Sequence, residues 1–202
     1  MDYIFLVGGF AQSKLLLQRV RNEFERGGLR VVVPLRPGLS VLQGAVMLGM
    51  GASGRFVSRI CRATYCVGTV TRFDSSNPDH RGRATVKRKL LGVEYDYVPN
   101  GCSVIVSKGT RIAVDETHRT TVKSFDGFTE VWCPIYATPA ASPRWTTDPG
   151  MVLLGEICLP VADCDTVVVE LSFGRTEIRT AAVNERTRVR RPAAIDYDFG
   201  TL

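Results

Sequence analysis

The chain has 202 residues, 45% of them hydrophobic and 23% charged, which excludes a disordered protein and allows one large domain or two small ones. The net charge is +6, but Lys and Arg are spread along the chain, which favours a solvated surface over a nucleic-acid-binding patch. The sequence holds no apolar run near the roughly 20 residues that span a bilayer and no signal-peptide pattern. We therefore expect a reduced, cytoplasmic protein with no nucleic-acid or membrane partner.

The six cysteines and the two histidines, His80 and His118, are the candidate metal ligands. The cysteines form no Cys-x-x-Cys pair, and several of them lie within apolar runs, where a thiol behaves as a small core residue. The sequence therefore predicts no metal site.

The N-terminal residues alternate between strand and helix patterns. Residues 3–7 are apolar and rich in β-formers, which predicts a strand buried on both faces. Gly8 and Gly9 end it in a turn that a ligand could approach closely, although the spacing alone favours a plain structural turn. A helix over residues 14–26 follows, with Ser13 as its N-cap.

A second strand over residues 30–34 should pair in parallel with the first, because a helix joins the two. Pro37-Gly38 predicts a turn, and Ser40 is expected to cap a second helix that runs to about Met50. The α/β pattern ends near residue 55.

From about Tyr65 onwards short strand patterns recur. Residues 73–100 are polar and basic, which predicts an exposed loop with room for one strand pair. The apolar runs and turn residues that follow favour an antiparallel β-sandwich. The expected strands are 65–72, 102–107, 111–114, 119–124, 129–136, 152–160, 166–173 and 176–183, with a tight hairpin at Phe173-Gly174-Arg175-Thr176.

The order of several motifs resembles the C-terminal half of the 70-kDa heat-shock chaperone family, and most closely its divergent member-12 branch. Residues 4–13 resemble the adenosine motif of the actin-like ATPase fold, and residues 39–49 resemble the helix that follows that motif. Residues 106–110, 153–157 and 168–183 fall in the order expected of the chaperone's peptide-binding β-domain. The resemblance implies an α+β chain: 1–55, a partial actin-like ATPase segment; 56–64, a connector; and 65–202, an antiparallel β-sandwich.

The resemblance also implies roles for four residues of the first turn. Gly8 and Gly9 would approach the adenosine of ATP or ADP, and Phe10 and Gln12 fall where the family has polar contacts to it. Phe10 replaces the usual serine and Gln12 the usual arginine, which implies weaker nucleotide contacts. The family's phosphate loops and catalytic residues precede this motif, and the chain begins at Met1. We therefore expect no ATP hydrolysis, no catalytic residue and no enzyme activity.

In the β-domain the resemblance places Cys102 and Val131 near an apolar peptide groove, although both fit equally well as ordinary core residues. His118 is expected at the surface, because a catalytic dyad would need a nucleophile beside it. Two hypotheses follow: a chaperone module that binds unfolded or extended apolar peptide, and a scaffold that binds one specific protein. The basic runs are expected to be solvated loops: Arg81, Arg83, Lys87, Arg88 and Lys89, and Arg186, Arg188, Arg190 and Arg191.

Overall fold

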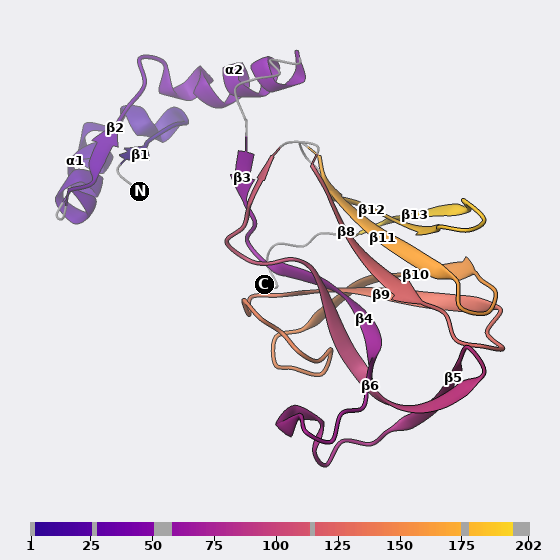
Figure 1. Ribbon diagram of the computed structural model, residues 1–202. Helices are drawn as coiled ribbons and strands as arrows, with labels where there is room; N and C mark the ends of the chain where they lie inside the picture. Colours follow the sequence, from indigo (N-terminus) through magenta and orange to yellow (C-terminus); the bar gives the residue numbers. More distant parts are fainter. Residues whose placement is uncertain (1–2, 26–27, 51–57, 114–115, 175–177, 196–202) are drawn as a thin grey trace. The chain divides into compact units, whose positions relative to one another are not determined.

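The computed structural model describes residues 3–25, 28–50, 58–113, 116–174 and 178–195. The chain divides into two compact units, Met1–Arg55 and Phe56–Leu202. The first is a small α/β segment and the second is an all-β domain (Figure 1).

The first unit contains the predicted strand-helix-strand motif. β1 (Tyr3–Phe5) and β2 (Arg30–Val32) pair in parallel, and the 3-10 helix η1 (Gly9–Gln12) and α1 (Lys14–Phe24) connect them. Ser13 is the predicted N-cap, and its Oγ accepts a hydrogen bond from the Leu16 N–H at 3.4 Å. This confirms the cap, because one otherwise unpaired helix donor is satisfied by a side chain.

The second helix, α2 (Pro37–Gly49), begins earlier than predicted. Pro37 starts the helix instead of forming a turn, because its fixed φ suits the first helical position and its missing N–H is not needed there. Ser40 therefore lies inside the helix, and its Oγ donates to the Arg36 carbonyl at 2.9 Å. The expectation that Ser40 is the N-cap is wrong.

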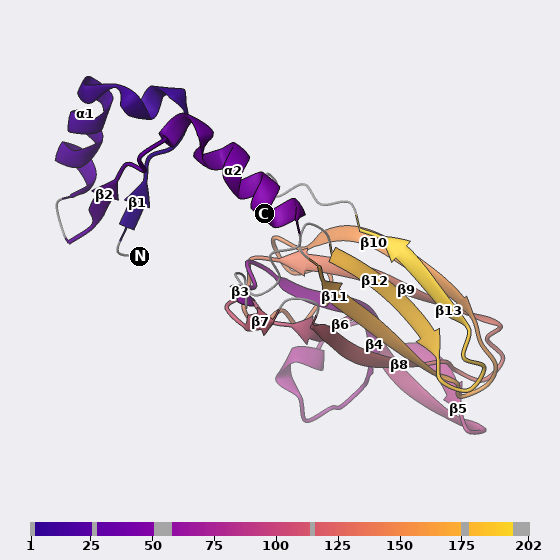
Figure 2. The ribbon, with the colours of Figure 1, turned by 90° about the horizontal axis from the view of Figure 1, so that it is seen from above.

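The second unit consists of strands joined by turns and loops. Two sheets, with strand orders β10-β9-β4-β6-β5 and β13-β12-β11-β8, consist of antiparallel pairs, and β3 pairs with β7. The two larger sheets pack face to face (Figures 1 and 2), which confirms the predicted antiparallel β-rich domain. The elements are β3 (Ser58–Ile60), β4 (Thr64–Arg72), η2 (Pro78–His80), β5 (Val86–Leu90), β6 (Val93–Val106), β7 (Arg111–Ala113), β8 (Thr117–Lys123), β9 (Glu130–Thr138), β10 (Val152–Pro160), β11 (Thr166–Phe173), β12 (Ile178–Asn184) and β13 (Arg190–Ala194).

The core lies between these two sheets and follows the period-two pattern of the strands. In β11 alternate side chains from Val167 to Phe173 are buried, while their neighbours are half-buried. Tyr65 of β4 meets Phe173 edge to face, with ring centroids 5.6 Å apart. One polar link also crosses the core, since the Ser103 and Thr120 hydroxyls lie 2.7 Å apart. Each fully buried apolar side chain of this core contributes about 1.5–3 kcal/mol to folding.

Two segments of this unit differ in detail from the sequence-based expectation. The expected connector 56–64 contains β3, and the arginine-rich run expected to be a loop contains β13. Residues 73–100 do contain one strand pair, the β5–β6 hairpin, whose turn residues Leu91 and Gly92 have φ of 53° and 79°. Part of the predicted hairpin at 173–176 lies outside the described residues.

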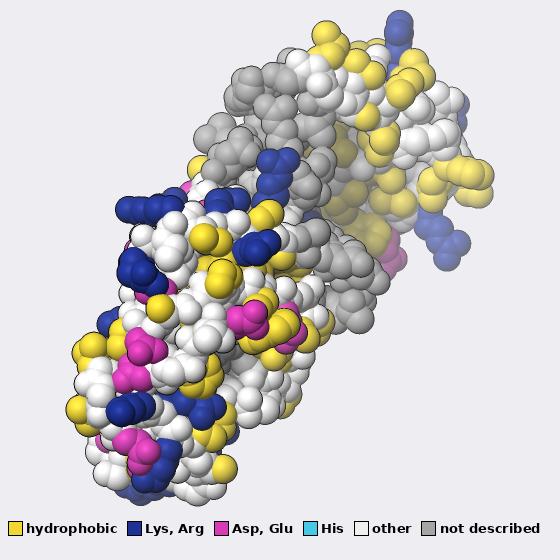
Figure 3. Space-filling model, turned by 90° about the vertical axis from the view of Figure 1, so that its right-hand side faces the viewer, with side chains coloured by type: hydrophobic (Ala, Val, Ile, Leu, Met, Phe, Trp, Pro, Cys, Tyr) yellow, Lys and Arg dark blue, Asp and Glu magenta, His cyan; other side chains and the backbone are white. Residues whose placement is uncertain are grey.

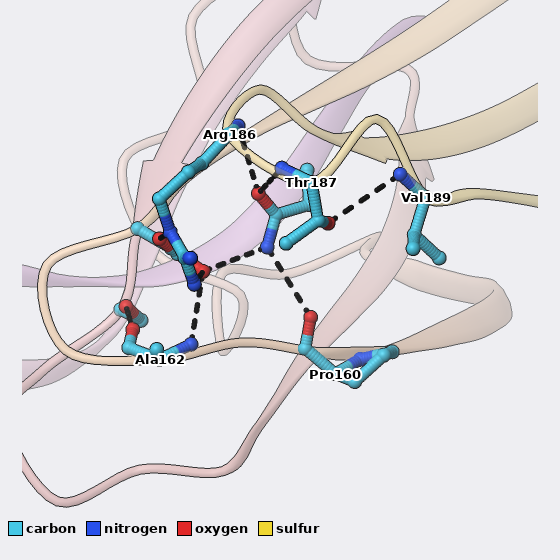
Figure 4. Close-up of polar contacts among 8 residues, drawn as sticks. Pro160, Ala162, Arg186, Thr187 and Val189 are labelled. Carbon is cyan, nitrogen blue, oxygen red and sulfur yellow. Dashed lines mark hydrogen bonds and ion pairs between the residues drawn. The ribbon is translucent and has the colours of Figure 1, made fainter.

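A buried carboxylate joins two turns at one end of the sandwich. The Asp165 side chain, 2% exposed, pairs with Arg186, with 2.5 Å from Nε to Oδ1. It also accepts hydrogen bonds from the Ala162 N–H and the Asn184 amide, both at 2.9 Å or less. The Asn184 Oδ1 in turn accepts the Thr187 N–H (Figure 4). This network fixes the β10–β11 turn against the β12–β13 turn.

Candidate functional site

The glycine turn of the first unit brings four predicted residues together: Gly8, Gly9, Phe10 and Gln12. Gly8 has φ 92° and ψ 172°, a region that only glycine adopts readily. Its N–H donates to the Pro37 carbonyl at 2.7 Å, so this donor joins the turn to the start of α2. The remaining three residues lie in η1.

The turn is open on its outer side. A Cβ built on Gly8 or Gly9 has no atom within 4 Å, so a ligand has room to approach the backbone. Phe10 is 85% exposed, and Gln12 is exposed as well. The arrangement can place the backbone beside a flat ring such as adenine. Of the Phe10 and Gln12 side chains, only that of Gln12 is polar, and its amide is uncharged.

The first unit buries little of its own apolar surface. Among its described residues only Ala11, Val31 and Pro37 are buried apolar residues, and Tyr3 and Phe5 of β1 are about half exposed. The expectation that the first strand is buried on both faces is therefore wrong for this unit. The reason is that one parallel strand pair and two helices cannot cover both faces of their own sheet.

The two predicted peptide-contact residues of the β-domain do not lie together. Val131 of β9 packs against the core between the sheets, on the same face of its strand as Cys133 and Ile135. Cys102 of β6 pairs with Gly68 of β4, and β4 turns Val67 towards the core. Cys102 therefore lies on the outer face of the five-stranded sheet, opposite to Val131.

That outer face carries a row of apolar side chains that crosses four strands, and we call it the apolar row. Its members are paired in register: Leu153 with Tyr136, Tyr136 with Cys66, and Cys66 with Val104. Leu153 is 50% exposed and Val104 is 38% exposed. Trp132 of β9, on the same face, is 59% exposed. Between them Tyr136 is half-buried and Cys66 is fully buried, so the exposed apolar side chains are Leu153, Val104 and Trp132. An outward sheet face is usually polar, so these exposed apolar side chains indicate a binding surface.

The connection between β9 and β10, residues 139–151, lies against this face beside the apolar row, and we call it the strap. Its Trp145 is 5% exposed and forms a bridge with Gly101 of β6. The His80 ring meets the indole edge to face at 5.8 Å, and the Arg83 guanidinium lies 3.8 Å above it. An ion pair between Arg144 and Asp79 adds a further contact to the β4–β5 connection.

Most of the basic residues singled out in the sequence have partners. Lys87 pairs with Glu94 at 2.8 Å, and Arg88 lies over the Phe128 ring at 5.4 Å. Arg190 pairs with Glu170 at 3.2 Å. On the face displayed in Figure 3, Lys and Arg side chains are interspersed with Asp and Glu. Lys87 and Arg88 lie in β5 and Arg190 lies in β13, so the expectation that these runs are loops is wrong for them.

His118 lies half-buried on β8 and is not fully at the surface as expected. Its ring meets Phe173 edge to face at 5.9 Å, and its Nε2 is 3.6 Å from the Glu116 carboxylate. The contacts described for His118 are thus to an aromatic ring and a carboxylate, which is not the arrangement of a nucleophile with its base.

The sequence interpretation missed the residues of the apolar row and Trp132. The sequence of β9 could have revealed this surface, because its outward residues Trp132, Pro134 and Tyr136 are as apolar as its inward ones. A strand apolar on both faces in an antiparallel sheet indicates that its second face is also covered. The pairing of Tyr136 with Leu153 and Cys66 depends on strand register, which one sequence does not reveal.

Within the described part of the chain, no group of three or more His, Cys, Asp and Glu residues is placed to hold a metal ion. None of the helices described there has the length and apolar character needed to cross a membrane.

Comparison with known proteins gives consistent relatives. No family model matches the sequence. Heat shock 70 kDa protein 12B of Homo sapiens is 32% identical over 208 aligned positions, which cover 96% of this chain and 29% of that protein. Heat shock 70 kDa protein 12A is 26% identical in Mus musculus and 25% identical in Homo sapiens, over 98% of this chain and 29% of each relative. The chain thus spans less than a third of the length of these relatives. The similarity extends over nearly all of this chain's residues, which supports the resemblance to the heat shock 70 kDa protein 12 branch of the 70-kDa heat-shock protein family.

Proposed function

We propose that the second unit is a peptide-binding β-sandwich of a chaperone-like protein, and that it takes extended apolar segments on the outer face of the five-stranded sheet. The observation that carries this proposal is the apolar row with the adjacent Trp132. The row runs across β10, β9, β4 and β6, so a peptide lying along it would contact several strands.

The expected affinity is modest. Covering the exposed halves of Leu153, Val104 and Trp132 contributes about 1 kcal/mol each at ordinary transfer energies. Association and ordering of the peptide cost several kcal/mol. These terms sum to much less than the about 8 kcal/mol that corresponds to a Kd of 1 μM, so we expect binding much weaker than micromolar, with fast exchange.

For the first unit, the proposal is that the glycine turn descends from an adenosine contact for ATP or ADP. The open backbone at Gly8 and Gly9 supports it, while Phe10 and Gln12 weaken it because they replace the charged and hydroxyl groups expected there. No ATP hydrolysis by this chain is expected. An isothermal titration with ADP tests retained binding, and submillimolar affinity that is lost in Gly9→Val would show that the turn still contacts nucleotide.

A panel of labelled peptides distinguishes a chaperone-like surface from a scaffold. Fluorescence anisotropy would be recorded with several unrelated extended apolar peptides, each matched by a version with Ser in place of the apolar residues. Saturable binding of most apolar peptides, with little change at high salt, is the expected result. Binding of none of them by the folded chain would favour a scaffold with one specific protein partner. A steep loss of affinity with salt would indicate electrostatic binding instead.

A further inference from the structure

Two of the six cysteines lie side by side on neighbouring strands. Cys66 of β4 pairs with Val104 of β6, and Cys102 of β6 pairs with Gly68 of β4. The two cysteines are therefore diagonal neighbours on the outer face of the sheet. Each thiol also shifts the pKa of the other, as expected of two neighbouring thiols on one face of the sheet.

We propose that Cys66 and Cys102 form a dithiol that hydrogen peroxide oxidises reversibly to a disulfide. The inference is independent of the proposed peptide binding, because it depends on the two sulfurs and their surroundings alone.

The two thiols differ in a way that assigns their roles. Cys66 is fully buried, and the hydrogen bond with Cys102 together with burial raises its pKa well above the usual range. Cys102 is half-buried, and the hydrogen bond from Cys66 lowers its pKa, although burial and the nearby Asp148 carboxylate act against this. The thiolate is the form that attacks peroxide, so Cys102 is the group that reacts first.

The reaction balances with peroxide as the oxidant. The Cys102 thiolate attacks one peroxide oxygen and becomes a sulfenic acid, and hydroxide leaves and takes up a proton to become water. The Cys66 sulfur then attacks the sulfenic sulfur, which forms the S–S bond and releases the second water. In sum, two thiols and one hydrogen peroxide give one disulfide and two waters.

The backbone makes this disulfide strained and easily reduced. Diagonal neighbours in a sheet have Cα atoms about 7–8 Å apart, somewhat beyond the usual separation in a disulfide. The β4–β6 register is irregular at Tyr65/Cys66 and at Thr69/Thr71, which gives both strands room to shift. The strap opposes a larger shift, because the Cys102 N–H donates to the Arg144 carbonyl at 3.0 Å. Strained disulfides are the ones that thiols reduce readily.

The other four cysteines are placed differently. Cys133 of β9 pairs with Ile157 of β10, and both face the core. Cys158 of β10 pairs with Trp132 of β9 and faces the outer side, so the two thiols lie on opposite faces of the sheet. The Cys61 thiol donates to the Ala63 carbonyl at 3.0 Å, and the Cys164 thiol donates to the Asp126 carboxylate at 3.1 Å. All six cysteines are in the described part of the chain, and Cys66 with Cys102 is the pair there that lies diagonally across two neighbouring strands on one face of a sheet.

The test uses the full chain, reduced and freed of reductant, then treated with a small excess of hydrogen peroxide. Free thiols are counted after denaturation, and the linked peptides are mapped by mass spectrometry without reduction. The expected result is the loss of two of the six thiols, a Cys66–Cys102 linkage, and full recovery on mild reduction.

Two variants sharpen the result. Peroxide oxidation of the Cys66→Ala variant should stop at a Cys102 sulfenic acid, which dimedone traps. The Cys158→Ser variant should lose two thiols on oxidation, as the unsubstituted chain does. A linkage between any other pair, or six thiols that survive peroxide in the folded chain, overturns the proposal. The linkage map of the unsubstituted chain decides this even where a variant does not fold.

Discussion

Gly8 and Gly9 are adjacent, but the backbone requires glycine at only one of them. Both have open space where a Cβ would lie, and only Gly8 has a positive φ, 92°. Gly8→Ala should therefore cost about 1–3 kcal/mol of local stability, whereas Gly9→Ala should change it by less than about 0.5 kcal/mol.

Amide hydrogen exchange at Ala11 and Ser13 measures this difference, because their N–H groups bond to the Gly8 and Phe10 carbonyls. We expect exchange to accelerate about tenfold or more in Gly8→Ala, since 1.4 kcal/mol corresponds to tenfold. Equal exchange rates in the two variants would show that the turn is not strained.

Asp165 gives the chain a defined dependence of stability on pH. Hydrogen bonds from Arg186, then from the Ala162 N–H and Asn184, hold the pKa of its carboxyl well below the usual range. A pKa that is lower in the folded state than in the unfolded one stabilises the fold above the unfolded value, about 3.9. This stabilisation is lost as the pH falls from there toward the folded pKa.

Asp165→Asn should lower the melting temperature at pH 7. The difference in melting temperature from the unsubstituted chain should narrow below about pH 4, because the Asp165 carboxyl of the unfolded unsubstituted chain then takes up a proton. Thermal unfolding followed by circular dichroism from pH 7 to pH 3 checks this. Glu185→Gln, an exposed change in the β12–β13 turn, is the control and should match the unsubstituted chain. A gap of constant size at every pH would contradict the assigned role of the carboxylate.

At the element scale, the two tryptophans make a matched pair on one sheet. Trp145 is 5% exposed in the strap, and Trp132 is 59% exposed on β9. Trp145→Ala removes the ring that His80 and Arg83 contact, so it should cost about 3 kcal/mol. Trp132→Ala should cost less than about 1 kcal/mol, because it removes little buried area.

Urea unfolding and limited proteolysis measure the two effects. Cleavage within residues 139–151 should appear in Trp145→Ala and not in Trp132→Ala. Equal destabilisation by both substitutions would mean that the strap does not depend on Trp145.

The elements also show which features one sequence can predict. The strand over residues 166–173 and the cap at Ser13 depend on near neighbours, and both were predicted. The edge strand β13 was not, because its arginines suggested a loop; in the sheet Arg190 has the Glu170 carboxylate of β11 as its partner. The apolar row likewise depends on which residues of β10, β9, β4 and β6 are paired, and pairing over long sequence separations cannot be deduced from local patterns.

At the scale of the whole molecule, the two units differ in how much core each has. The second unit has a continuous core between its sheets, while the first exposes much of α2, including Val41 and Leu42 at more than 60%. We expect residues 56–202 to remain folded without the first unit, with a melting temperature within a few degrees. Residues 1–55 alone should aggregate, because open strand edges and apolar surface remain uncovered.

Thermal unfolding and light scattering of the two pieces test this. A monomeric and cooperatively folded 1–55 piece would contradict it, as would a 56–202 piece that does not fold.

The central claim is that the outer face of the five-stranded sheet binds extended apolar peptide. Leu153→Asp tests it most directly, because Leu153 is 50% exposed and a carboxylate there keeps the fold while it makes the apolar row polar. Val168→Asp is the control, since Val168 of β11 faces outward from the other sheet. Val131→Asp is unsuitable, because Val131 packs against the core.

The measurement is the anisotropy of one labelled apolar peptide titrated with the three chains, each shown to be folded by circular dichroism. The account predicts saturable binding by the unsubstituted chain and by Val168→Asp, and at least about tenfold weaker binding by Leu153→Asp, equivalent to 1.4 kcal/mol. Equal affinity in all three chains would place the peptide elsewhere, and no binding by any of them would contradict the proposed function.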